Sequence, residues 1–352
     1  MSFYEALQMD PSILKRYIAK GTCWKEKRFY WVAMAVRSVL IVAFAIGFIG
    51  GLSVVFGQEN TPFAVALFCI FLGIRFVNFA YCMKDSLVAL AVDFAILLFV
   101  PSIVAVVPAP VAALVHFVSF FVLLFLTTQQ PQFGNGGLYS FAYVYLTGNP
   151  VFGAALGKRT LLALFGYGIC ALLLYRKHRH LHAQVRLSHW VNQFGLHQPT
   201  HLWQVRMALG TGILLAAGQF FGVERFMWMG FACASLLSEY PYAGHVTQRF
   251  WQRVLGAVVG SGLFFLVYQI TPASFHSLLG PLGGFCLGFC TDYRYKTAVN
   301  CFGALMLASG IYGVQGAVAL RVLNTLWGAV FALLFAFLFH QCVGKRFAKE
   351  TV

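Results

Sequence analysis

The sequence predicts an all-α fold, a polytopic transmembrane bundle of about 12 helices. Apolar residues make up 60% of the 352 residues and charged residues only 10%, so too few polar side chains remain to cover a water-soluble surface. A bilayer crossing needs about 20 predominantly apolar residues, and long apolar runs joined by short loops fill most of the chain. These observations predict an integral membrane protein and leave little room for a separate soluble domain.

The apolar runs are predicted to form two six-helix halves, residues 29–175 and 204–343. Their helices are expected at about 30–55, 62–80, 86–104, 108–127, 137–150 and 154–175, and then at 204–222, 226–241, 250–269, 275–290, 297–313 and 316–342. The fifth is the weakest, because the uncharged stretch before it is full of helix breakers. A re-entrant or interrupted segment is the alternative there, since irregular backbone is tolerated at depth only where protein or a water-filled cavity covers it.

Residues 1–28 are predicted to form a cytoplasmic amphipathic segment. Asp10 can cap a helix N-terminus, and Pro11 suits the first helical position. The short helix that follows is basic on one side and apolar on the other, which favours a place in the membrane interface. Its apolar side carries Ile13, Leu14, Tyr17 and Ile18.

The formal net charge of +15 would suggest a nucleic-acid partner if the protein were soluble. Most Lys and Arg residues lie beside apolar segments, so contacts with membrane lipids and no nucleic acid are expected instead. With both termini cytoplasmic, including a tail at 344–352, the 25 Lys and Arg residues lie on the inner side except for Arg37, Lys158, Arg159, Arg225 and Arg321. This distribution fits the positive-inside rule.

The polar stretch between the halves, residues 176–203, is basic and holds most of the 10 histidines. A metal-binding tract or a pH sensor is conceivable there. The stretch contains no acidic residue or cysteine, however, and its apolar residues fit a linker helix on the inner leaflet. Cys286 and Cys290 stand four apart without His or acidic neighbours, so neither a metal ion nor a cofactor is expected.

The two halves resemble an internal repeat. Arg37 and Arg206 align near the starts of their first helices, and Arg159 and Arg321 align with the same six-residue gap before a glycine. Six crossings per half would give both halves the same orientation, related by an axis along the membrane normal.

Closely spaced glycines mark two expected packing strips. The stretch from Gln248 to Tyr268 opens with Arg249 and Arg253, one helical turn apart, and continues with Gly256 and Gly260 on the same face. Such a strip lets another helix approach closely inside lipid. A second series with four-residue steps predicts either a packing strip or a smooth pore wall, and it consists of Gly280, Gly284 and Gly288.

The motifs QRFWQRVLGAVVG, from Gln248, and ALRVLNTLWGAVFALL, from Ala319, resemble the signature helices of the fusaric-acid-resistance, or aromatic acid exporter, superfamily. The resemblance is strongest from Gln204 to Cys342, and the chain is also distantly similar to aluminium-activated malate transporters, which are anion channels. It implies a bacterial inner-membrane protein that exports aromatic and related organic acids, with a homodimeric membrane domain.

Five arginines are the candidate substrate-binding residues. Arginine in the hydrocarbon core costs about 2.5–3.5 kcal/mol on insertion scales, so such residues usually face a cavity or a partner. A guanidinium there can grip a carboxylate through two hydrogen bonds. The alternative is that each arginine lies at a helix end and extends to lipid headgroups. The candidates are Arg37, Arg159, Arg206, Arg253 and Arg321.

Asp93 and Glu239 are the candidate proton-coupling residues. Asp93 stands in the middle of an apolar segment, and Glu239 ends one. A carboxyl group in a low-dielectric interior can exchange protons near neutral pH, as a proton-coupled exporter requires. A salt bridge is the alternative for Asp93, and an interfacial position is the alternative for Glu239.

The expected function is proton-coupled export of small organic anions by alternating access. A passive organic-anion channel is the direct alternative. A membrane enzyme acting on lipid-linked substrates is a third, less favoured class, because the sequence has no HExxH and no serine nucleophile motif.

Overall fold

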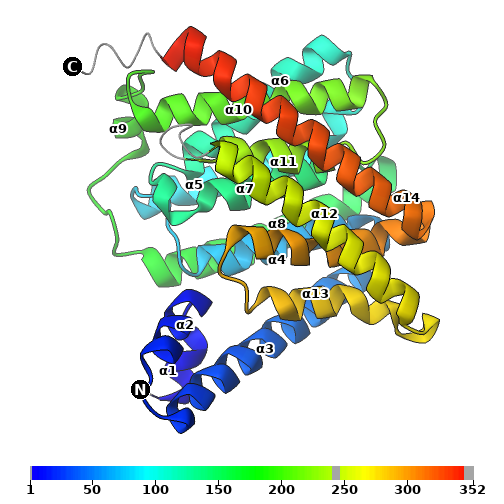
Figure 1. The fold of residues 1–352 in the computed structure, drawn as a ribbon. Helices are drawn as coiled ribbons and strands as arrows, with labels where there is room; N and C mark the ends of the chain where they lie inside the picture. The colour runs from blue at the N-terminus through cyan, green and yellow to red at the C-terminus, as the bar shows by residue number, and fades with distance from the viewer. Residues whose placement is uncertain (1, 240–245, 345–352) are drawn as a thin grey trace. The chain divides into compact units, whose positions relative to one another are not determined.

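The computed structural model describes residues 2–239 and 246–344, which are helical almost throughout and contain no strand (Figure 1). The predicted all-α class is therefore confirmed for this part of the chain. The helices are α1 (Phe3–Gln8), α2 (Pro11–Lys20), α3 (Trp24–Phe56), α4 (Thr61–Ile74), α5 (Met83–Val104), α6 (Ala109–Thr127), α7 (Asn135–Thr147), α8 (Gly153–His178), α9 (Leu187–Asn192), α10 (Pro199–Phe220), α11 (Met227–Leu237), α12 (Val246–Ile270), α13 (Leu279–Leu287) and α14 (Tyr293–Phe339).

Six of the described helices are long and apolar enough to cross a membrane: α3, α5, α6, α8, α12 and the run Tyr293–Val343 that begins with α14. Each expected segment contains a helix, and α14 supplies the last two. Several helices in the expected segments, namely α4, α7, α11 and α13, are shorter than the roughly 20 residues that a crossing needs. The chain is thus a multi-pass helical membrane protein, while the layout of twelve crossings in two repeats stays a prediction.

A single glycine divides α14. Gly313 has φ 68° and ψ 167° inside an otherwise helical run. This backbone region is almost exclusive to glycine, because a Cβ would clash there. The position coincides with the predicted boundary between segments 297–313 and 316–342.

The short helix α7 occupies the place of the weak fifth segment. A 3₁₀ turn, Pro131–Phe133, precedes it, and Gly134 with φ 82° leads into it. Its 13 residues are mostly buried, and it packs against α4, α5, α6 and α11. Protein therefore covers the helix itself, whereas Gln132, Phe133 and Gly134 of the irregular backbone before it are exposed.

The chain divides into two compact units, residues 1–47 with 251–325 and residues 48–250 with 326–352, here called unit 1 and unit 2. In unit 2, α4 and α5 pack against α7 and α8, α6 packs against α5, α7 and α10, and α11 packs against α7 and α10. The most extensive of these contacts is between α6 and α10. Each unit contains helices from both predicted halves. The boundaries 29–175, 176–203 and 204–343 therefore remain predictions, and residues 345–352 of the expected tail lie outside the described residues.

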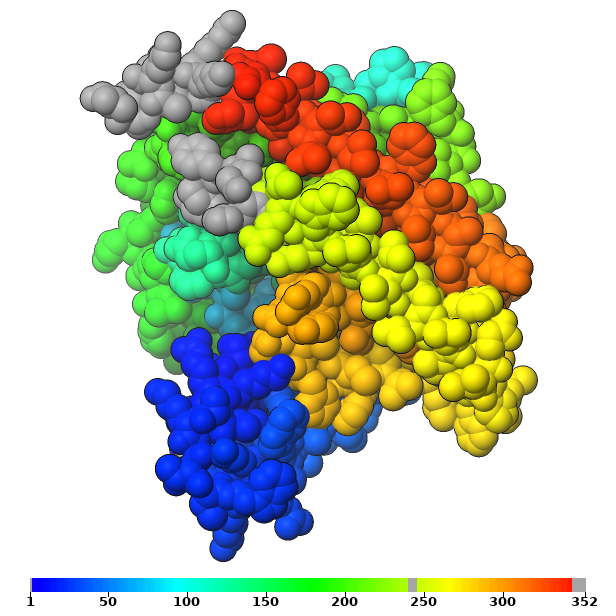
Figure 2. Space-filling view, in the orientation of Figure 1, coloured from blue at the N-terminus to red at the C-terminus, as the bar shows by residue number. Residues whose placement is uncertain are grey.

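The N-terminal segment folds back on α3 within unit 1, and these residues form one continuous mass in the space-filling view (Figure 2). Asp10 caps α2 through Ser12 and Pro11 lies in its first turn, as predicted. Leu14 of α2 is buried in a cluster with the first turns of α3, and Tyr17 stacks on Tyr30 with ring centroids 5.3 Å apart. The helix α1, whose N-terminus is capped by Ser2, was not predicted from the sequence.

The linker between α8 and α10 is attached to the rest of unit 2. Asp85 accepts a hydrogen bond from the Leu187 amide at 2.8 Å and pairs with Arg186 at 3.0 Å. His178 donates through Nε2 to the Ile74 carbonyl at 2.8 Å. The linker contains the short helix α9 and runs directly into α10 at Pro199.

Candidate functional site

Arg253 and Arg321 are both buried in unit 1. Arg253 lies in the first half of α12 and is 9% exposed, and Arg321 lies in the second arm of α14 and is 4% exposed. The two guanidinium groups lie within electrostatic range of each other. Arg321 also interacts with the buried Cys301 thiol, and Arg253 Nη1 donates to the Tyr293 hydroxyl at 3.5 Å. This arrangement, here called the arginine pair, is a concentrated and nearly buried positive charge.

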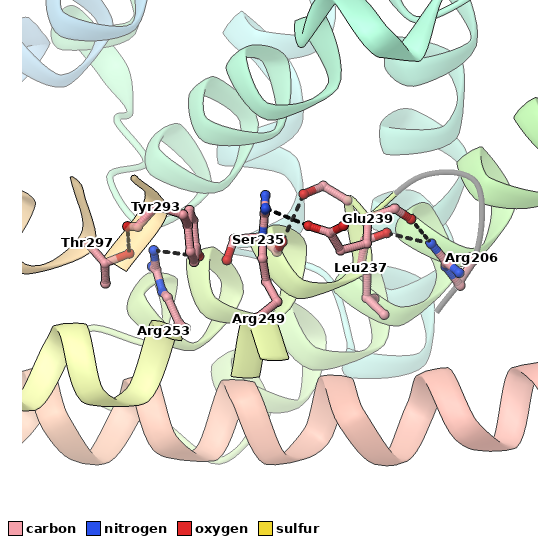
Figure 3. Close-up of polar contacts among 9 residues, drawn as sticks. Arg206, Ser235, Leu237, Glu239, Arg249, Arg253, Tyr293 and Thr297 are labelled. Carbon is pink, nitrogen blue, oxygen red and sulfur yellow. Dashed lines mark hydrogen bonds and ion pairs between the residues drawn. The ribbon is translucent and has the colours of Figure 1, made fainter. Parts of the chain in front are cut away.

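Helix packing fixes the position of Arg253. An added Cβ on Gly256 would lie 2.9 Å from both the Arg294 carbonyl oxygen and Thr297 Cβ, and one on Gly260 would overlap the backbone of Ala298. The glycines therefore bring α12 against the first arm of α14. Tyr293 and Thr297 lie on that arm beside Arg253, and Thr297 donates to the Tyr293 carbonyl at 2.9 Å (Figure 3).

The other predicted glycine strip also lies in unit 1. A Cβ on Gly284 would meet Val42 at 3.3 Å, and one on Gly288 would overlap the Ser38 side chain. Among the described residues, no atom lies within 4 Å of the position that a Cβ of Gly280 would take. Two of the three glycines thus face α3 closely.

Arg206 and Glu239 meet at the end of α11 in unit 2 (Figure 3). Arg206 is 6% exposed, and its Nη2 donates to the Leu237 carbonyl at 3.0 Å and the Glu239 carbonyl at 2.5 Å. The last carbonyls of a helix lack intrahelical partners and carry partial negative charge, so a guanidinium stabilises them. The Glu239 carboxylate pairs with Arg249 at 2.5 Å. Two guanidinium groups and one carboxylate therefore lie together at the end of α11.

Arg159 is fully enclosed in unit 2. Its Nε donates to Asn60 Oδ1 at 2.9 Å, Nη1 to the Asn149 carbonyl at 3.0 Å and Nη2 to the Glu59 carbonyl at 3.1 Å. The side chain has no exposed surface. The guanidinium joins the turn before α4 to the turn before α8, and this arrangement leaves it little capacity to bind a solute.

Arg37 is half-buried in α3 and lies within electrostatic range of Asp10 at the start of α2, inside unit 1. Partial burial by itself raises the pKa of Asp10. Hydrogen bonds from Ser12 and the positive charges of Lys296 and Arg37 outweigh this effect, and the pKa lies below its ordinary value of 3.8.

Asp93 is completely buried in α5, and neither carboxyl oxygen has a hydrogen-bond partner among the described residues. The hydroxyl groups of Tyr81 and Tyr139 are close enough to interact with it electrostatically. A carboxylate without partners in a low-dielectric interior costs several kcal/mol. The protonated form is therefore the one compatible with this position.

Three further residues lie beside the candidate groups or in a membrane helix, and only one of them, His116, has a signal in the sequence. Tyr293 and Cys301 approach the arginine pair through helix packing, which no local pattern reveals. His116 is a lone ionisable residue in the apolar helix α6, and an ionisable residue inside the membrane is a functional candidate by default. No three His, Cys, Asp or Glu side chains in the described ranges converge as metal ligands would.

The fold and these buried charges define a class, a multi-pass helical membrane protein with cationic groups enclosed between its helices. Residues 213–335 match a family model described as fusaric acid resistance protein-like. The matched segment includes both arginines of the arginine pair. No curated protein and no solved structure matches the chain. The match confirms the resemblance in this segment, and it supports a role in membrane transport or efflux of organic compounds.

Proposed function

We propose that the protein exports aromatic or other organic anions across a bacterial inner membrane and draws on the proton gradient to do so. In this proposal it is a homodimer with both termini cytoplasmic. It carries out transport and no enzymatic reaction.

The observation that supports this proposal most is the arginine pair. Like charges that lie close together in a poorly hydrated interior repel each other, and an anion between them relieves that repulsion. A carboxylate suits the place because guanidinium groups bind it through two parallel hydrogen bonds. The Tyr293 hydroxyl beside Arg253 supplies a further polar contact. The arginine pair is therefore the proposed carboxylate site in unit 1, and Arg206 beside Glu239 and Arg249 is a second cationic position, in unit 2.

Asp93 is the proposed proton-coupling residue. Its isolation favours the neutral form, and an opening that lets water reach it would allow the proton to leave. Release of a proton at one stage of the cycle and uptake at another would link transport to the gradient. Glu239 is a weaker candidate, since it is already paired with Arg249.

The main test is efflux of radiolabelled benzoate from proteoliposomes under an imposed pH gradient. Arg253→Ala and Arg321→Ala should each lower efflux at least ten-fold, because each removes a charged partner of the carboxylate. Arg16→Ala, at an exposed position of α2, is the matched control and should leave efflux unchanged. Efflux at the wild-type rate in both pair variants would refute the carboxylate site.

Asp93→Asn separates an exporter from a passive channel. In a proton-driven exporter this variant should lose the stimulation by the pH gradient, since asparagine cannot exchange a proton. A channel should keep its anion conductance and its indifference to the gradient. Retained stimulation in Asp93→Asn would exclude Asp93 from coupling.

The enzyme alternative depends on the histidine-rich linker. Replacing His180, His182, His189 and His197 by Ala should leave benzoate efflux unchanged. A loss of efflux with the protein still folded would show that the linker histidines have a functional role.

A further inference from the structure

Unit 2 contains a half-open cavity of about 530 Å³, located where α5 and α10 end and α6 and α11 begin. Sites for small molecules typically measure about 300–1,000 Å³ and combine apolar walls with a few placed polar groups. None of the predicted site residues lines this cavity. Its apolar wall includes Val104, Val107, Ala216, Phe220, Val223 and Phe226.

A buried hydrogen-bonded chain orients one polar group of the wall, Gln219. His116, which has no exposed surface, contacts Gln219 Oε1 through Nε2 at 3.1 Å and the Tyr143 hydroxyl through Nδ1 at 2.9 Å. Because Oε1 can only accept, Nε2 carries the proton, and Nδ1 accepts from Tyr143. With its oxygen occupied in this way, Gln219 has its amide N–H groups left for a ligand in the cavity.

The second polar group, Arg225, lies on a strained turn. Its φ is 55°, a left-handed value that is uncommon for a residue other than glycine. The Arg225 carbonyl accepts from the Trp228 amide at 2.8 Å, which ties the turn to the start of α11. Strain of this kind persists where the surroundings hold it, often at ligand sites. Glu224 also belongs to the wall, but it is exposed and screened by water, whereas Arg225 is half-buried.

From this geometry we propose that the cavity binds a small organic acid, with its carboxylate against Gln219 and Arg225 and its apolar body against the walls. His116 is a positioning residue that acts through Gln219. The proposal rests on the proposed transport function, and with a cytoplasmic N-terminus the cavity lies at the outer end of the helices. It is then the site from which the exported anion leaves.

The test is equilibrium binding of radiolabelled benzoate and hexanoate to the full chain in lipid nanodiscs. Ala105 lines the cavity from an exposed position, and Ala105→Trp should fill it and weaken binding at least ten-fold. Val106→Trp changes the exposed neighbour outside the wall and should bind as the wild type does. Gln219→Leu should also weaken binding ten-fold and serves if Ala105→Trp does not fold. His116→Phe should weaken binding in the wild-type background and have no further effect in Gln219→Leu.

Parallel measurements on Arg253→Ala/Arg321→Ala separate this proposal from the proposed carboxylate site. Binding that survives loss of the arginine pair and disappears with Ala105→Trp supports the cavity. Wild-type binding in Ala105→Trp and Gln219→Leu overturns the cavity site while leaving the arginine pair intact. Absence of binding of both probes to the wild-type protein overturns the ligand class.

Discussion

Arg159 and Arg321 occupy matching places in the predicted repeat, each separated from a following glycine by six residues, yet their surroundings differ. Arg159 donates to three oxygen acceptors from two turns and has no exposed surface. Arg321 lies within electrostatic range of a second cation, Arg253, and interacts with the Cys301 thiol. A guanidinium surrounded by acceptors stabilises structure, whereas one near another cation adds to a local positive charge that an anion would balance. Sequence spacing alone predicts the same substrate-binding role for both residues.

The largest expected effect is the loss of the Arg159 contacts. Arg159→Ala leaves the Asn60 amide oxygen and two backbone carbonyls without their donor, and unpaired buried polar groups cost about 1–3 kcal/mol each. The free energy of unfolding in detergent should fall by about 3–5 kcal/mol. Lys158→Ala, at the exposed neighbouring position, should change it by less than about 0.5 kcal/mol. Equal stability of the two variants would contradict the structural role of Arg159.

The glycines that follow the two arginines give the next effect. A methyl group on Gly328 would overlap the Met229 backbone, whereas one on Gly166 would meet the side chains of Leu67 and Phe94. Side chains can rotate and a packed backbone cannot, so Gly328→Ala should lower the free energy of unfolding by about 1–3 kcal/mol. Gly166→Ala should lower it less, because alanine gains about 0.5–1 kcal/mol over glycine inside a helix. Thermal unfolding in the same detergent measures both, and the reverse order would refute the packing argument.

Replacing Arg321 should disturb stability far less than replacing Arg159. Arg321→Met keeps the length of the side chain and removes one of two neighbouring positive charges. Apolar replacements of buried charges are often neutral or stabilising, so the free energy of unfolding should change by less than about 1.5 kcal/mol while benzoate efflux falls. A stability loss as large as that of Arg159→Ala would make Arg321 another structural residue.

The comparison also marks what the sequence could predict. Helix positions follow from local apolar runs and helix breakers, so α7, the break at Gly313 and the Asp10 cap all agree with expectation. The partners of each arginine depend on residues far away in the chain, such as Asn60 for Arg159 and Tyr293 for Arg253. A single sequence holds no record of those contacts. The cavity beside Gln219 escaped prediction for the same reason, because three separate stretches of chain form it, within residues 104–112, 147–150 and 216–226.

The smallest expected effect concerns Arg37 and the pH dependence of unit 1. The pKa of Asp10 is lower in the folded protein than its ordinary value of 3.8. Its stabilising contribution is therefore fully present above the unfolded pKa and is lost as the pH falls through the folded pKa. Asp10→Asn keeps a residue that caps helices well, so it should change stability little at pH 7 and reduce its decline below pH 4.

Unfolding of the full chain in detergent between pH 3 and pH 7 measures this contribution. Because Arg37 helps to lower the pKa of Asp10, Arg37→Gln should reduce the acid sensitivity in the same direction, by a smaller amount. Combined with Asp10→Asn it should add nothing to that reduction, since both changes act on one interaction. Additive effects of the two changes would mean that Arg37 acts on another acidic group.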